Sequence, residues 1–220
     1  MLAVMDFDGT ITERDCMDTL FRRHLTSYED LIAAMRSGQL RPADAVRRGV
    51  SELPIAVDQI LEEFSQAAVL RGGFAEFLRR LVAGGGRGVV ISAGFREGIE
   101  RAWRREGLAD VELFAGELLA DPLNGHRLDL HPAFGDCDVC GPRVCKGPIV
   151  DGLRRPGDVL AAFGDGQRDL CMARRADLVF ARSGLARSCE REGIAYVPLE
   201  DFTTALSAMT DLLGGTLQRP

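Results

Sequence analysis

The sequence predicts an α/β protein whose core is a Rossmann-like parallel sheet with helices on both faces. From Gly73 onward, short apolar runs such as Gly88–Ser92 and Val159–Phe163 alternate with helical patterns. This alternation is typical of parallel strands that are joined by helices. Residues 13–72 contain only amphipathic helical patterns. We therefore expect a core formed by residues 1–12 and 73–220, with a helical cap, residues 13–72, inserted after the first strand.

The first strand is the apolar run that begins at Leu2 and ends before Asp6. The cap that follows is expected to hold four helices. Two of them follow Pro42 and Pro54, and proline is well tolerated in the first turn of a helix. The predicted cap helices are Cys16–Leu25, Tyr28–Arg36, Ala43–Leu53 and Ile55–Ala68.

The core elements then follow in order. Glycines end the first two core helices, and Asn124-Gly125 predicts the turn of a β-hairpin within Glu117–Leu130. A small cysteine-bearing loop, Asp136–Cys145, comes next. The predicted strands are Gly88–Ser92, Val111–Ala115, Val159–Phe163, Leu178–Ala181 and Ile194–Val197, and the predicted helices are Phe74–Val82, Arg96–Glu106, Gly147–Arg154, Gln167–Arg174 and Phe202–Leu213.

Composition limits the partners that we expect. The net charge of −6 and the pI of about 5.2 argue against nucleic acid and against an anionic membrane surface. No apolar run approaches the ~18 residues of a membrane span, and no secretory signal is visible, so we expect a cytoplasmic protein with reduced cysteines. We expect it to act on a small molecule as a monomer or a homodimer.

Charged and polar residues collect where the predicted strands end. Asp6 and Asp8 follow the first strand, Ser92-Ala93 ends the second, and Asp165 with Asp169 follows Val159–Phe163. Ligands of parallel sheets bind beyond the carboxyl ends of the strands. Converging carboxylates repel one another unless a cation lies between them, and Mg²⁺ prefers oxygen ligands. A bound Mg²⁺ would also let an acidic protein hold an anionic phosphate. Each aspartate alone is equally well explained as a helix cap.

Four motifs in this order resemble those of the haloacid dehalogenase superfamily of phosphatases. They are DFDGT, VISAG, the Cys145-Lys146 pair that opens a helix, and GDGQRD. The resemblance covers the whole chain, because an inserted helical cap is also typical of that superfamily.

The resemblance implies a role for each motif residue. Asp6 would be the nucleophile that forms an aspartyl-phosphate, and Asp8 would be the general acid and base. Mg²⁺ would be held by Asp6, the backbone carbonyl of Asp8 and Asp165, with Asp169 in support. The phosphate-binding residues would be Ser92, Ala93 and Lys146.

Within the superfamily two branches are similar to this chain. Phosphoserine phosphatases share its layout and place an acid where Asp15 stands, but Gly49 occupies the place of their carboxylate-binding arginine; Arg47 or Arg48 would have to substitute. The segments CDVCGPRVCKGPIV, DLVFAR and YVPLEDF resemble instead the methionine-salvage phosphatases of 2-hydroxy-3-keto-5-methylthiopentenyl-1-phosphate and their looser kin. Arg168 departs from the asparagine of phosphoserine phosphatases. A phosphomutase and a phosphate- or zinc-binding regulatory module remain as alternatives.

The cysteine loop has the spacing of metal ligands. Cys137, Cys140 and Cys145, with His131 upstream, offer the four ligands of a structural Zn²⁺. A redox-active dithiol and incidental buried thiols are the alternatives. We interpret Cys16, Cys171 and Cys189 as small core residues.

Overall fold

A seven-stranded sheet forms the centre of the molecule in the computed structural model, which describes residues 1–108, 111–121 and 125–212. The strand order is β4-β3-β2-β1-β7-β8-β9, and every neighbouring pair is parallel except β3 and β4. The fold is therefore Rossmann-like, as predicted. The strands are β1 (Leu2–Met5), β2 (Arg87–Phe95), β3 (Glu112–Asp121), β4 (Gly125–Asp129), β7 (Leu160–Gly164), β8 (Leu178–Ala181) and β9 (Val197–Pro198).

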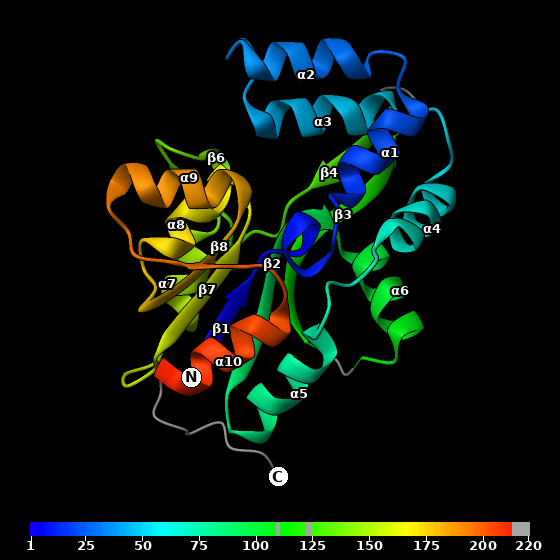
Figure 1. The fold of residues 1–220 in the computed structure, drawn as a ribbon. Coiled ribbons are helices and arrows are strands. Elements are labelled where there is room, and N and C mark those ends of the chain that lie inside the picture. Colours follow the sequence, from blue (N-terminus) through cyan, green and yellow to red (C-terminus); the bar gives the residue numbers. More distant parts are fainter. Residues whose placement is uncertain (109–110, 122–124, 213–220) are drawn as a thin grey trace.

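Helices cover both faces of the sheet (Figure 1). Side chains of β1 alternate between the faces, because successive residues of a strand point in opposite directions. Ala3 and Met5 join the core under α5 and α10, while Leu2 and Val4 pack with residues of α7. The core helices are α5 (Phe74–Ala83), α6 (Arg96–Glu106), α7 (Gly147–Leu153), α8 (Leu170–Ala173), α9 (Ser183–Glu192) and α10 (Phe202–Leu212).

Four helices lie between β1 and α5, in the segment that we call the cap (residues 13–72). They are α1 (Cys16–His24), α2 (Tyr28–Arg36), α3 (Pro42–Glu52) and α4 (Val57–Ala67). In Figure 1, α2 and α3 lie side by side at the top of the molecule, and α4 lies next to α6. The cap also touches the sheet, since α3 contacts β4. None of the helices in the described part of the chain has the length and apolar character that crossing a bilayer requires.

Several predicted boundaries differ from the structure. The predicted strand Val111–Ala115 and the first arm of the predicted hairpin form one continuous strand, β3, which pairs first with β2 and then with β4. Asn124 of the predicted turn lies outside the described residues, whereas Gly125 begins β4 with φ of 81°. Residues 167–169 form a 3₁₀ turn before the short α8. The last strand is Val197–Pro198 and not Ile194–Val197.

A small antiparallel hairpin precedes α7. It consists of β5 (Gly135–Cys137) and β6 (Gly141–Cys145) and holds the predicted cysteine loop. Because β1 lies between β2 and β7, the residues that follow these three strands meet at one edge of the sheet. Lys146, at the end of β6, reaches the same edge.

Candidate active site

The centre of this edge is a buried lysine that joins two aspartates. The Lys146 ammonium nitrogen lies 2.5 Å from Oδ1 of Asp6 and 2.7 Å from Oδ1 of Asp169. All three residues are buried, so each charge would be costly without the others. Lys146 immediately precedes α7, and the two acids follow β1 and β7. The predicted phosphate-binding lysine therefore stands beside the predicted nucleophile.

Asp169 organises the loop that carries Asp165. Its Oδ2 atom accepts hydrogen bonds from the backbone N–H groups of Asp165 at 3.1 Å and Gly166 at 2.9 Å. A Cβ atom at Gly164 would lie 2.5 Å from the Asp169 side chain, so only glycine leaves room for this arrangement. Both oxygens of Asp169 are thus engaged by Lys146 and the loop, which fits a supporting role.

Asp6, Asp165 and Asp169 form a group that could hold a metal ion. Each offers one carboxylate oxygen, and these oxygens lie within 4.8 Å of one another. Burial, and then the charge of Asp169, raises the pKa of Asp6 to about 6. Burial, and then the charges of Asp6 and Asp169, raises the pKa of Asp165 to about 9. Such crowded carboxylates suit a divalent cation with a preference for oxygen.

Asp8 points to the cap side of the site. Its Oδ1 atom accepts a hydrogen bond of 3.0 Å from the backbone N–H of Cys16, the first residue of α1. Burial, followed by the charges of Asp15 and Asp6, raises the pKa of Asp8 to about 8. A Cβ atom at Gly94 would lie 2.8 Å from Oδ2 of Asp8, so the VISAG segment must pass close to this carboxyl. The two acids of DFDGT therefore lie in different surroundings.

The backbone between Asp8 and Glu13 is held by an arginine that the sequence analysis did not identify. The buried Arg71 guanidinium donates to the carbonyl oxygens of Gly9 at 2.9 Å, Thr10 at 2.9 Å and Thr12 at 2.8 Å. The turn also needs Gly9, whose φ is 73° and whose Cβ would meet Asp165 at 2.7 Å. Arg71 stands at the end of the cap without any motif around it, so no sequence signal pointed to it.

The remaining phosphate-binding candidates lie on β2. Ser92 is fully buried, and its Oγ atom accepts a hydrogen bond of 2.9 Å from the Gly94 N–H. Ala93 and Gly94 line a cavity of about 130 Å³ together with the acidic residues and Lys146. The cavity is thus lined by carboxylates and a lysine together with small residues.

A second cavity, of about 210 Å³, continues from the first into the cap. Asp15, Met17, Val46 and Arg168 line both cavities. The other residues of the second cavity are Asp18, Phe21, Tyr28, Leu31, Ile32, Met35, Pro42 and Ala45. We call it the cap pocket. Apart from Asp15, its lining was not foreseen, because amphipathic patterns do not say which helix faces meet.

Two predicted cap contacts can now be placed. Asp15 lines both cavities and caps α1, where its side chain accepts from the Asp18 N–H at 2.8 Å. Arg47 pairs with Asp44 at 3.2 Å on the surface, and it is not among the residues that line the catalytic cavity or the cap pocket. Val46, one position earlier on α3, lines both cavities, whereas Arg47 lines a smaller neighbouring cavity together with Ala93 and Arg168. Substrate contact by Arg47 stays a prediction. Arg168 is the arginine that lines these two cavities.

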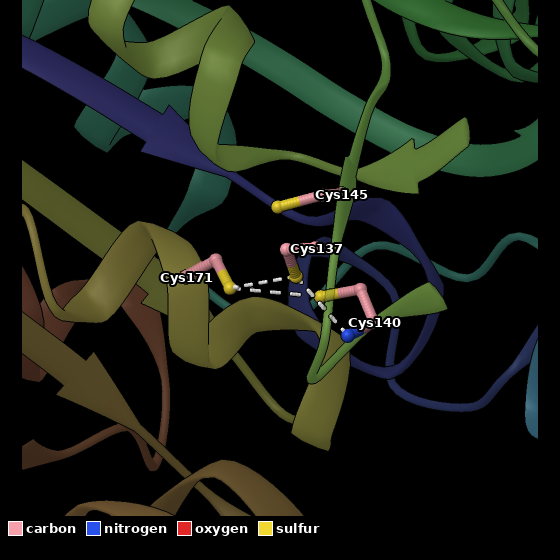
Figure 2. Close-up of side chains that lie close together, drawn as sticks. All are labelled: Cys137, Cys140, Cys145 and Cys171. Carbon is pink, nitrogen blue, oxygen red and sulfur yellow. Dashed lines mark hydrogen bonds between the residues drawn. The ribbon is translucent and has the colours of Figure 1, made fainter. Parts of the chain in front are cut away.

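The cysteine loop differs from the prediction in its fourth member. The sulfurs of Cys137, Cys140 and Cys145 are joined by that of Cys171, and all four lie within 4.8 Å of one another (Figure 2). His131 was predicted in this place. Its ring instead packs edge-on against Phe114, and its Nδ1 atom accepts from the Ala133 N–H. Cys171, interpreted as a small core residue, is indeed buried, and it is also the fourth member of this group.

Comparison with known proteins agrees with this geometry. The family model of haloacid dehalogenase-like hydrolases matches residues 3–174. A 2-hydroxy-3-keto-5-methylthiopentenyl-1-phosphate phosphatase from an Exiguobacterium strain is 35% identical over 208 residues, which covers 90% of this chain and 92% of the relative. The enzyme of the same name from Microcystis aeruginosa is 32% identical over 202 residues, covering 90% and 91%.

Solved structures share the fold. A phosphoserine phosphatase from T. onnurineus superposes with a TM-score of 0.67 at 21% identity, covering 96% of this chain and 94% of that chain. A substrate-bound phosphoserine phosphatase gives a TM-score of 0.68 at 19% identity, covering 94% and 97%. These matches confirm the resemblance that the four motifs indicated. The chain belongs to the haloacid dehalogenase-like hydrolases, in a group whose relatives over nine-tenths of its length are phosphatases.

Proposed function

We propose that the protein is a Mg²⁺-dependent phosphomonoester hydrolase that works through an aspartyl-phosphate on Asp6. The observation that supports this most strongly is the buried contact of Lys146 with both Asp6 and Asp169, in a cavity that Asp8 and Asp165 also line. This arrangement places a carboxylate, a cation and a second acid around one small volume. Phosphoryl transfer depends mainly on such positioning and charge neutralisation.

The two aspartates of DFDGT divide the reaction between them. Asp6 attacks phosphorus, the bond to the leaving oxygen breaks, and Asp8 gives its proton to that oxygen. Asp8 then takes a proton from water, which attacks the aspartyl-phosphate, releases phosphate and restores the Asp6 carboxylate. The burial that raises the pKa of Asp8 favours the protonated form that the first step requires.

Other residues hold the ion and the phosphate. Mg²⁺ would be held by Asp6, Asp165 and the Asp8 carbonyl, and when bound it neutralises charge on the phosphoryl group and the acids. Asp169 supports this site through Lys146 and the loop that carries Asp165. Lys146, Ser92 and the Ala93 backbone would bind the phosphoryl oxygens.

The cap pocket supports an apolar substrate tail. Leu31, Met35 and Phe21 belong to its mainly aliphatic and aromatic wall, and its polar end with Asp15 and Arg168 meets the catalytic cavity. A sugar-derived ester with hydroxyl and keto groups near the phosphate and a methylthio group at the far end would place its polar part at the polar end of the pocket and its apolar part against the apolar wall. We therefore propose a methylthio-ketose-phosphate-like ester of methionine salvage as substrate, in line with the names of the relatives.

A phosphoserine-type phosphatase is the second candidate, because Asp15 could bind an ammonium group. Phosphoserine phosphatases carry a carboxylate-binding arginine at the position that Gly49 occupies here. A Cβ atom at Gly49 would lie 2.6 Å from the Phe21 ring. An arginine has no room at this position while Phe21 lines the pocket. A phosphomutase would use the same residues, whereas a binding-only module would not require Asp8.

The acidic charge of −6 favours a small anionic metabolite held through a cation over nucleic acid or a membrane. We propose a cytoplasmic enzyme that works as a monomer or homodimer.

The test is hydrolysis of p-nitrophenyl phosphate, phosphoserine and a methylthio-ketose phosphate analogue, with Mg²⁺ and with excess chelator. We expect Mg²⁺-dependent activity, highest kcat/KM for the methylthio ester, and a loss of at least ~10³-fold in Asp6→Asn. Asp6→Asn activity equal to wild type would refute the mechanism. A preference for phosphoserine would refute the substrate proposal alone.

A further inference from the structure

Four cysteine sulfurs face one another beside the active site. The Sγ atom of Cys171 lies 3.7 Å from that of Cys137 and 3.6 Å from that of Cys140, and all four sulfurs, with Cys145, lie within 4.8 Å of one another. A tetrahedral Zn²⁺ with four thiolates has sulfur–sulfur edges of about 3.8 Å, given Zn–S bonds of about 2.3 Å. All six cysteines of the chain are free thiols in the structure. The spacing of the sulfurs thus fits a metal site.

The backbone around the sulfurs is arranged as a ligand site requires. Cys137 and Cys140 lie at the turn of the β5–β6 hairpin, where the Cys140 N–H donates to the Cys137 sulfur at 3.1 Å. The Gly147 N–H donates to the Cys145 sulfur at 3.4 Å. Gly141 follows the CxxC turn with φ of 96°, a conformation that favours glycine. Donors of this kind stabilise thiolates and orient metal ligands.

The elements that contribute the cysteines show what a metal would join. Figure 2 shows three of the cysteines on the hairpin segment and Cys171 on α8. Cys145 immediately precedes Lys146, and Cys171 follows Asp169 by two residues. In the active site the ion pair of Lys146 with Asp169 joins these two segments. The hairpin also touches the cap, because Ala43 of α3 packs with Cys140 and Val144.

We propose that Cys137, Cys140, Cys145 and Cys171 bind one structural Zn²⁺. On binding, the thiols lose their protons to solvent as four S–Zn bonds form, and the bound ion fixes the hairpin that carries Lys146 to the helix that follows Asp169. The ion has four protein ligands and no open position, so it takes no part in the reaction. The proposal goes beyond the phosphatase function and does not depend on it.

A disulfide is the competing chemistry. Cys171 lies nearly equally far from Cys137 and Cys140, so neither pair is favoured by distance, and the sulfurs are well beyond the ~2.05 Å of an S–S bond. A disulfide would need an external oxidant and would leave two buried thiols without a function.

The experiment measures the metal content of protein purified without chelator. We expect about one zinc per chain in the wild type and below about 0.3 in Cys171→Ser. The matched control is Cys189→Ala, a buried cysteine of α9 that lies outside the group, which should retain the zinc of the wild type. Zinc content of Cys171→Ser equal to wild type would refute the ligand set.

A second measurement covers the case in which Cys171→Ser does not fold. Metal-free wild type is titrated with Co²⁺ alone, and we expect a thiolate-to-cobalt absorption band that saturates near one equivalent and disappears when Zn²⁺ is added. The absence of this band, or an intact mass two hydrogens lower with no bound zinc, would overturn the proposal. Mg²⁺ should not displace the cobalt, which separates this site from the carboxylates around Asp6.

Discussion

The floor of the active site and the cap pocket are built in different ways. In the floor, charged atoms are tied to one another: Lys146 binds Asp6 and Asp169, and Asp169 binds the backbone of the loop after β7. In the cap pocket the wall consists largely of apolar side chains from α1, α2 and α3. Few other residues could therefore replace those of the floor, whereas substitutions in the apolar wall would change the shape of the cap pocket. Under the proposed function, the floor carries out the chemistry and the cap pocket selects the substrate.

Asp8 lies on the boundary between the two regions. It follows β1, but its carboxyl is held by the N–H of Cys16, the first residue of the cap helix α1. In the proposed mechanism Asp8 donates the proton, and its position depends on the cap through this hydrogen bond. A variant at this position tests whether the two regions work as separate units.

Among the variants that compare the two regions, Asp8→Asn should have the largest effect. The amide cannot transfer a proton, so kcat for an alkyl phosphate should fall by about 10²–10⁴-fold. p-Nitrophenolate leaves without a proton, so the loss for p-nitrophenyl phosphate should be clearly smaller. Steady-state kinetics on both esters measures the difference.

The control for this variant is Asp58→Asn, an exposed aspartate of α4 that pairs with Arg101. It should leave the activity on both esters unchanged. An equal loss on the two esters in Asp8→Asn would contradict the role of Asp8 as general acid and would assign it to positioning instead.

The floor was largely predictable from the sequence, and the reason is physical. Short apolar runs identify buried parallel strands, and the carboxyl ends of such strands meet at one edge of the sheet. Asp6 and Asp165 therefore converge when β1 and β7 lie side by side. Lys146 follows a strand of the separate β5–β6 hairpin, and the resemblance of the motifs was what placed it with them. Arg71 was not predictable, because its guanidinium binds backbone carbonyls that any sequence would provide.

The lining of the cap pocket and the fourth cysteine of the group could not be predicted from the sequence, for a related reason. An amphipathic pattern says that a helix has a buried face but does not say what that face meets, so Val46 and Arg47 could not be told apart. Cys171 lies within a helical pattern 26 residues after Cys145, where a small buried thiol is the ordinary interpretation. His131 had the better sequence spacing, but its ring packs on Phe114.

The second largest effect should come from a substitution in the cap pocket and should be confined to substrates with an apolar tail. Met35→Glu introduces a carboxylate into the apolar wall, where Met35 is only half-buried, so the fold should tolerate it. We expect kcat/KM for the methylthio ester to fall by about 10–100-fold, mainly through KM, because an apolar tail would then meet a charge. Activity on p-nitrophenyl phosphate, measured in parallel, should change much less.

Ala33→Glu is the matched control, because it places the same charge on the exposed side of α2. It should leave both activities unchanged. If Met35→Glu lowers kcat/KM for the two esters by the same factor, the cap pocket does not hold the substrate tail, and the separation of floor and wall fails.

The smallest effect concerns Gly49, within α3. Alanine favours a helix over glycine by about 1 kcal/mol, but here its Cβ would lie 2.6 Å from the Phe21 ring, and overpacking typically costs about 1–3 kcal/mol. We expect Gly49→Ala to lower the free energy of unfolding by about 1 kcal/mol in urea denaturation. The matched control is Gly152→Ala in α7, where no atom lies within 4 Å of the added Cβ, so that only the helix propensity acts and stability should rise. Equal stabilisation by both substitutions would mean that Phe21 moves aside easily. The cap would then have room for a longer side chain at position 49, and the argument against a phosphoserine-type pocket would lose its physical basis.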